Sequence, residues 1–213
     1  MEKGIESVYK HHHQNRPPEF AVFGDARGNF FSSQIGKGKK VLDLGCRDGT
    51  LAKYFLEGNR VWGIDIDNEA LGRAAEKGIT TRQVDLNGSW DILNGEKFDA
   101  VVAAEVLEHL YFPEIVLDKI NDVLNSGGVL VGSIPNAFSL KNRIRLLLGK
   151  KRYTTLGDPT HINHFSFNDL NNALKKKFTE VKIKPLVRKP FGPIARLMPG
   201  LIAYDFIFSA KKI

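Results

Sequence analysis

Residues 41–50 read Val-Leu-Asp-Leu-Gly-Cys-Arg-Asp-Gly-Thr, and this stretch decides the fold. Its apolar residues around one acid predict a buried parallel strand, and the two glycines that follow predict a tight turn. A helical apolar pattern over residues 50–57 comes next. A strand, a glycine turn and a helix start predict a site for an anionic or polar ligand, because free backbone N–H groups point out of such a turn. An ordinary strand–helix corner is the alternative.

The spacing of the glycines separates two classes of ligand. A dinucleotide-binding turn needs glycines at positions 45, 47 and 50, where this chain has Gly45, Arg47 and Thr50. The pattern instead resembles the first motif of the class I S-adenosylmethionine-dependent methyltransferases, acid-x-Gly-x-Gly-x-Gly. Asp43, Gly45 and Gly49 stand in that pattern, and Arg47 replaces its middle glycine. A second acid, Asp65, ends the next predicted strand, where a carboxylate can accept both ribose hydroxyls of an adenosine.

The resemblance implies a full set of contacts to S-adenosylmethionine. An acid at Asp85 would receive the adenine amino group, and Ile66 and Leu86 would stack on the ring. The methionine moiety would pass Ala104, and Arg27 would pair with the cofactor carboxylate, unless it is merely an exposed arginine. Cys46 lies in the cofactor turn and is interpreted as a small packing residue rather than a nucleophile. The predicted cofactor residues are Arg27, Asp43, Gly45, Cys46, Gly49, Asp65, Ile66, Asp85, Leu86 and Ala104.

A short string of acids and imidazole follows the fourth predicted strand. Glu105, Glu108 and His109 resemble the E-x-x-E-H string of the ubiquinone-biosynthesis O-methyltransferases, in which these groups can hold Mg²⁺. Two oxygen ligands suit Mg²⁺, whereas imidazole is a less usual partner. The alternative is a hydrogen-bond network at a helix start, without metal.

Residues 160–170 carry the remaining histidines of interest and resemble the Thr-His segment of the same family. His161 is the leading general base facing the acceptor, with His109 and His164 as the other catalytic candidates. Histidine suits this role because its unperturbed pKa lies near neutrality. The resemblance therefore implies O-methylation of a small-molecule or lipid-like acceptor. A nucleic-acid methyltransferase and a non-catalytic S-adenosylmethionine-binding protein are the alternatives.

Strands and helices alternate along the chain, which predicts an α/β, doubly wound, mostly parallel sheet. The resemblance implies seven strands with a reversed C-terminal hairpin, the Rossmann-like methyltransferase fold. Residues 1–38 are predicted to be an N-terminal lid segment, and 39–213 the methyltransferase domain with a basic insertion at about 136–165. The predicted strands are 41–44, 60–64, 79–84, 98–103, 129–134, 180–186 and 203–210. The predicted helices are 50–57, 68–77, one beginning at Pro113, and 169–177 capped by Asn168, whereas 185–199 is predicted to be a non-helical connection.

The amino-acid composition indicates the cellular location and the partners of the protein. A single cysteine, no signal peptide and no long apolar run predict a cytoplasmic protein. The net charge of +7 is uneven, because residues 136–190 hold 13 Lys and Arg against 3 Asp and Glu. Within 139–153, leucines and isoleucine recur at helical spacing beside six basic residues. This pattern predicts either peripheral contact with an anionic membrane or a helix that packs its leucines on the sheet. A nucleic-acid partner is disfavoured, because the strand-four motif of base methylases is missing.

Overall fold

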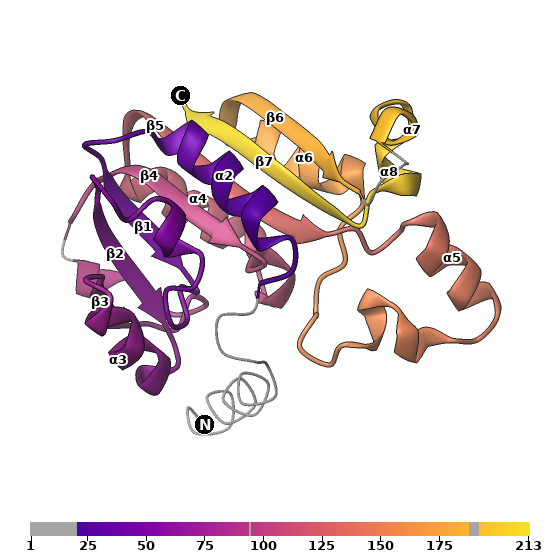
Figure 1. Cartoon of the computed structure of the whole chain (residues 1–213), viewed down its shortest axis with the longest axis horizontal. Helices are drawn as coiled ribbons and strands as arrows, with labels where there is room; N and C mark the ends of the chain where they lie inside the picture. The colour runs from indigo at the N-terminus through magenta and orange to yellow at the C-terminus, as the bar shows by residue number, and fades with distance from the viewer. Residues whose placement is uncertain (1–20, 94, 188–191) are drawn as a thin grey trace.

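The computed structural model describes residues 21–93, 95–187 and 192–213. Its centre is a seven-stranded sheet in the order β3-β2-β1-β4-β5-β7-β6 (Figure 1). Strands β1 to β5 run parallel, and β7 is antiparallel to both β5 and β6. The predicted doubly wound sheet with its reversed hairpin is therefore confirmed. The strands are β1 Lys40–Leu44, β2 Arg60–Asp65, β3 Thr80–Gln83, β4 Phe98–Ala104, β5 Leu124–Pro135, β6 Phe178–Leu186 and β7 Asp205–Lys212.

Helices cover both faces of the sheet, as a parallel sheet requires. The helices of the described residues are α2 Gly24–Ile35, α3 Asn68–Glu76, α4 Pro113–Val123, α5 Leu140–Leu147, α6 Phe167–Lys175, α7 Gly192–Leu197 and α8 Pro199–Ile202. The same residues form five 3₁₀ turns: η1 Ala52–Tyr54, η2 Asp91–Leu93, η3 Leu107–His109, η4 Lys151–Tyr153 and η5 Thr155–Gly157. Figure 1 shows α5 and the loop after it projecting from the body of the sheet.

The alternation of side chains along each strand divides the core into two layers. In β4, Ala100 and Val102 pack with the buried face of α2, whereas Val101 and Ala103 pack with α4 and α6. Phe31 of α2 is fully buried in the first layer. Residues 21–38, expected to belong to a lid, thus form a structural helix with its flanking turns. Residues 1–20 of the predicted lid lie outside the described residues.

The predicted helix at 50–57 is wrong. The segment forms only the short turn η1, in which the Phe55 N–H donates to the Ala52 carbonyl three residues earlier at 2.9 Å. Gly49 and Gly58 bound it with φ of +75° and +78°, so the chain turns back at both ends. This left-handed backbone confines any helix to the residues between the two glycines. The ligand site therefore cannot depend on a helix dipole at this position.

Other boundaries differ as well: the last strand is Asp205–Lys212 instead of 203–210, and the following differences have local reasons. β5 begins at Leu124 instead of residue 129, and its register against β4 shifts between Phe98 and Ala100. α6 is capped by Ser166 instead of Asn168, because Ser166 and Asp169 form a reciprocal capping box. The proline-rich connection contains α7 and α8, the second of which begins at Pro199, since proline is compatible with a first helical turn.

Candidate active site

A cavity of about 410 Å³ lies at the carboxyl ends of β1, β2 and β4, where the strand order reverses. Open parallel sheets bind ligands at this point. Of the ten residues expected to bind the cofactor, all but Gly49 line the cavity: Arg27, Asp43, Gly45, Cys46, Asp65, Ile66, Asp85, Leu86 and Ala104. Gly49 instead packs closely against Ile79, where a side chain would not fit, because a Cβ at position 49 would come within 2.6 Å of Ile79 Cδ1.

The turn after β1 has left-handed backbone at three alternate positions. Gly45, Arg47 and Gly49 have φ of +62°, +51° and +75°. Arg47 therefore adopts the conformation that the middle glycine of the motif would take, at a strain of about 1–2 kcal/mol. Its N–H donates to Asp65 Oδ2 at 2.9 Å, which ties the turn to the end of β2. The departure from the motif changes the side chain and leaves the path of the backbone intact.

Two buried carboxyl groups lie side by side in strands β1 and β2. Asp65 Oδ1 accepts the Asp67 N–H at 2.9 Å, so both of its oxygens receive backbone hydrogens. Asp43 is buried, and burial followed by the charge of Asp65 raises its pKa to about 8. Asp43 is consequently protonated at neutral pH.

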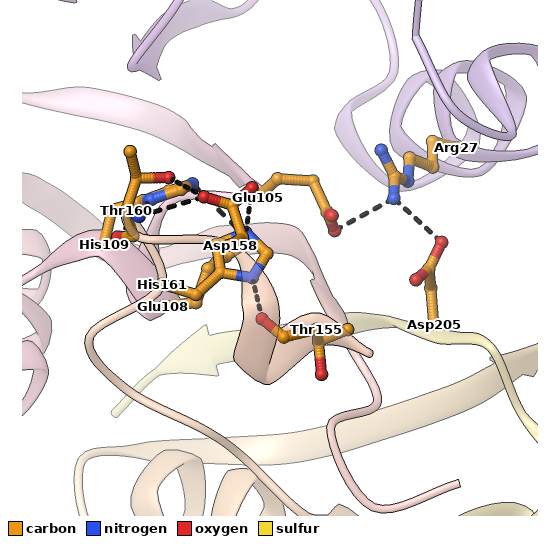
Figure 2. A network of polar contacts seen from close by, with 9 residues as sticks. All are labelled: Arg27, Glu105, Glu108, His109, Thr155, Asp158, Thr160, His161 and Asp205. Atoms are coloured by element: carbon orange, nitrogen blue, oxygen red, sulfur yellow. Dashed lines mark hydrogen bonds and ion pairs between the residues drawn. The ribbon is translucent and has the colours of Figure 1, made fainter. Parts of the chain in front are cut away.

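Arg27 projects from α2 into a cluster of two carboxylates (Figure 2). Its Nη2 lies 2.9 Å from Glu105 Oε1 and 3.0 Å from Asp205 Oδ2, and the residue is only 3% exposed. Burial, and then the charge of Glu105, raises the pKa of Asp205 to about 7, against the opposing effect of Arg27. Glu105 itself has a φ of +56°, a strained conformation for a residue with a side chain. Arg27 is therefore a buried ion-pair residue, and the exposed alternative is excluded.

A second polar cluster joins η3 to the loop before α6. His109 Nδ1 donates to the Thr160 carbonyl at 2.8 Å, and His161 Nδ1 donates to the Thr155 carbonyl at 3.2 Å. The two imidazole rings are 4.8 Å apart between centroids (Figure 2). Because a carbonyl can only accept, each ring carries a hydrogen on Nδ1, and His161 Nε2 lies 3.8 Å from Asp158 Oδ2.

Glu108 lies beneath these imidazoles and is 1% exposed. Neither of its carboxylate oxygens has a hydrogen-bond partner among the described residues, and Oε1 is 4.0 Å from His109 Nε2. Burial, and then the charge of Glu105, raises the pKa of Glu108 well above its usual value. One ligand atom each from Glu108, His109 and His161 lie within 4.8 Å of one another, which is compatible with a shared ion.

Two of the residues suggested by the sequence lie apart from this cluster. Glu105 pairs with Arg27 and is not in the group that could share an ion. His164 lines a separate cavity of about 400 Å³ between α4 and α6, and burial lowers its pKa. Asp205 was missed by sequence reasoning, because a single acid at the start of the last strand carries no local motif.

A family model described as a methyltransferase domain matches residues 11–177, well over half of the chain. The chain belongs to this family. The fold, the glycine turn and the two strand-end acids of the methyltransferase domain agree with that membership. The recognition made from the sequence is confirmed.

Curated relatives with similar sequences are ubiquinone biosynthesis O-methyltransferases. The protein from Haemophilus ducreyi is 37% identical over 122 residues, which is 53% of this chain and 51% of that protein. The one from Aeromonas salmonicida is 30% identical over 130 residues, or 58% and 52% of the two chains. This methyltransferase domain thus spans about half the length of the curated relatives that it matches.

Solved structures share the fold at low sequence identity. A S-adenosylmethionine-dependent methyltransferase from Archaeoglobus fulgidus has a TM-score of 0.65 and 20% identity, with 89% of this chain and 92% of that one covered. The N-methyltransferase NodS from Bradyrhizobium japonicum, in complex with S-adenosyl-L-homocysteine, has a TM-score of 0.62 and 18% identity, with 94% and 90% covered.

The buried Asp43 predicts a stability that falls as the pH rises. Its pKa is about 8 in the folded domain against 3.8 for an ordinary aspartate, so between these pH values the folded state holds a proton that the unfolded chain has lost. Replacing Asp43 with Asn should raise the melting temperature of the ligand-free domain at about pH 8. Each kcal/mol gained in the free energy of unfolding should raise it by about 2–4 °C. The gain should nearly disappear at about pH 3, where the group is mostly protonated in both states.

Calorimetric melting curves at the two pH values measure this effect. The exposed Asp122 is the matched control, because its Asn variant should melt like the parent at both. If the gain of the Asn variant over the parent is no larger at high pH than at low pH, the assignment of a buried, protonated carboxyl is contradicted.

Proposed function

We propose that this domain transfers a methyl group from S-adenosylmethionine to an oxygen atom of a small-molecule acceptor. The observation that carries the proposal is one continuous cavity, lined by the Gly45 turn and Asp65 at one side and by His109 and His161 at the other. A cofactor site and a set of proton acceptors therefore open into the same space. The names of the curated relatives support oxygen as the acceptor atom.

The lining residues fit the cofactor group by group. Asp65 can accept ribose hydroxyls from the end of β2, and Ile66 and Leu86 provide apolar surface for an adenine ring. Asp85 is exposed at the rim, where it can receive an amino group. The cofactor, when bound, supplies an activated sulfonium methyl. The work left to the protein is to align the acceptor oxygen, exclude water and remove one proton, and alignment alone can contribute about 7–11 kcal/mol.

His161 is the leading acceptor of that proton, with His109 beside it. The Thr155 carbonyl holds the hydrogen of His161 on Nδ1, so Nε2 is the nitrogen that can take a proton from a hydroxyl. A nucleic-acid acceptor is disfavoured, because acids outnumber the two arginines in the cavity lining and would repel phosphates. A protein that only binds S-adenosylmethionine would not need these imidazoles as proton acceptors.

The cofactor assignment predicts that Asp65→Ala weakens binding of S-adenosylmethionine and of S-adenosylhomocysteine alike. Each hydrogen bond lost to the charged group should account for about 1.5–3 kcal/mol, or roughly ten-fold or more in affinity. Isothermal titration calorimetry measures it, with Asp122→Ala as the control at an exposed site. Undiminished affinity in the Asp65 variant would overturn the assignment.

The base assignment predicts that His161→Ala lowers methyl transfer about 10²–10⁴-fold while cofactor affinity stays close to that of the parent. Transfer by the parent should also fall as the medium is acidified, because a protonated imidazole cannot accept a proton. His164→Ala is the matched comparison, since His164 lines the other cavity and its loss should leave the rate nearly unchanged. The assay is labelled methyl transfer to a cell extract, with mass identification of the product. Equal rates for His161→Ala and the parent would rule out the role.

A divalent cation is the second candidate role for the same cluster. The unpartnered oxygens of Glu108, together with Nδ1 anchors on both imidazoles, are typical of a metal ligand set with its supporting hydrogen bonds. The set of Glu108, His109 and His161 differs from the Mg²⁺ ligands Glu105, Glu108 and His109 suggested by the sequence. Two imidazoles suit ions such as Zn²⁺ or Fe²⁺ better than Mg²⁺. Elemental analysis before and after a chelator, compared with transfer activity, separates a metal from a base.

The segment 139–153 supports contact with an anionic membrane surface. Leu140, Ile144, Leu147 and Leu148 are all exposed, Leu147 to 87%, so the helix does not pack its leucines on the sheet. Basic side chains lie on the same segment: Lys141, Arg143, Arg145, Lys150, Lys151 and Arg152. Within the described ranges, no helix combines the length and apolar character needed to cross a membrane. We propose a peripheral role, in which the segment brings a lipid-like acceptor to the cavity.

This surface predicts sedimentation with anionic vesicles at low salt. Each basic residue near the surface contributes about 1 kcal/mol, so binding should weaken steeply as salt is added. A Leu147→Ser, Leu148→Ser double variant should bind less, because it loses buried apolar area, whereas Ile115→Ser on α4 is the matched exposed control. If the protein stays in the supernatant on the most anionic vesicles, a soluble acceptor is the better assignment.

A further inference from the structure

The cavity of about 400 Å³ between α4 and α6 is separate from the proposed cofactor site. Among residues 21–93, 95–187 and 192–213, none lines both this cavity and the one at the carboxyl ends of the strands. Its apolar wall is formed by Pro113, Leu117, Phe165 and Ala173. A cavity of this volume can hold a small organic molecule. The fold therefore provides a second space in which a ligand could bind.

The loop that forms one wall of this cavity is held in place at both ends. The Asn163 N–H donates to the Glu108 carbonyl at 2.9 Å, which ties the loop to η3. At the other end, the N–H and Oγ of Ser166 donate to Asp169 Oδ2 at 3.0 and 2.6 Å, as part of the capping box of α6. His164 lies between these two anchors. The position of its imidazole is therefore set before any ligand arrives.

One nitrogen of the His164 imidazole needs a hydrogen-bond partner. Its Nε2 is buried, and none of the described residues forms a hydrogen bond with it. Burial, and then the charges of His161 and Lys151, lower the pKa of His164, so the ring is neutral at physiological pH. A buried polar atom without a partner is unfavourable, because it has lost its hydrogen bonds to water. A hydroxyl group can pair with this nitrogen in either tautomer, since a hydroxyl both donates and accepts.

The charged side chains that line the cavity already have partners. Lys176 Nζ lies 3.1 Å from Glu114 Oε1, an ion pair that joins α6 to α4. The carboxylate of Asp169 accepts the two hydrogens of Ser166. A charged ligand would therefore have to break one of these pairs or give up its hydration without gaining a counter-charge. A neutral ligand avoids both costs.

We propose that the cavity between α4 and α6 binds a small neutral molecule that carries a hydroxyl group on an apolar ring. The hydroxyl pairs with His164 Nε2, and the ring packs against Leu117 and Phe165. The aromatic side chain of Phe165 favours an aromatic ring, so phenols are the ligand class that the lining fits best. The inference does not depend on the proposed function, because it uses none of the residues that line the first cavity.

Titration of the full chain with phenol, followed through amide chemical shifts by NMR, tests the inference. The shifts should be confined to residues 113–117 and 163–176. Phenol should bind more tightly than toluene, which lacks the hydroxyl, and than benzoate, which is charged. His164→Phe keeps a ring and removes both nitrogens, so it should lower the affinity for phenol about three- to ten-fold and remove the preference over toluene. Asp122→Asn, at an exposed site of α4, should bind phenol like the parent.

Ala173→Phe is the second variant, because a larger side chain there would fill the cavity and leave His164 in place. It should abolish the binding of phenol. If phenol and toluene bind the parent equally, or if His164→Phe binds phenol as tightly as the parent, the role of the imidazole is wrong. Tighter binding of benzoate than of phenol would overturn the choice of a neutral ligand. If phenol causes no shifts at these residues, water alone occupies the cavity and the inference fails.

Discussion

The structure depends on keeping carboxyl groups buried at one edge of its sheet. Asp43, Asp65 and Asp205 each lie less than a tenth exposed at the same cavity. A buried carboxylate is unfavourable unless it gains hydrogen bonds, a cation or a proton. Each acid is stabilised by a different one of these. Backbone N–H groups hold Asp65, Arg27 holds Asp205, and a raised pKa keeps Asp43 neutral.

The same constraint explains the strained backbone around the cavity. Arg47 and Glu105 both have positive φ although neither is a glycine. In Arg47 this conformation aims the N–H at Asp65, and in Glu105 it accompanies a carboxylate that reaches Arg27. Strain of this kind persists where surrounding contacts over-determine the local conformation. The strained backbone at Arg47 and Glu105 is therefore linked directly to the buried charged groups that line the cavity.

The projecting segment around α5 differs from the rest of the domain in the side chains that it exposes. Its apolar side chains are exposed and its basic residues face solvent, in contrast to α2, whose aromatic side chains lie in the core. The basic excess of the chain is thus concentrated away from an acidic cavity. This separation keeps the surface proposed to contact lipid electropositive while acids predominate among the described residues that line the cavity.

The sequence alone predicts the class of fold and the edge of the sheet at which the cavity lies. Strand–helix alternation and the acids at 43 and 65 are local patterns, and their spacing is preserved however the rest of the chain packs. It could not determine that 50–57 is a turn, because the glycines that bound the segment also permit a helix. Only the tertiary structure joined Arg27 to Asp205, which are 178 residues apart, and turned Glu105 toward them. Pairing across such a distance is decided by which strands are neighbours and by the need to neutralise buried charge, and neither leaves a mark in any short stretch of sequence.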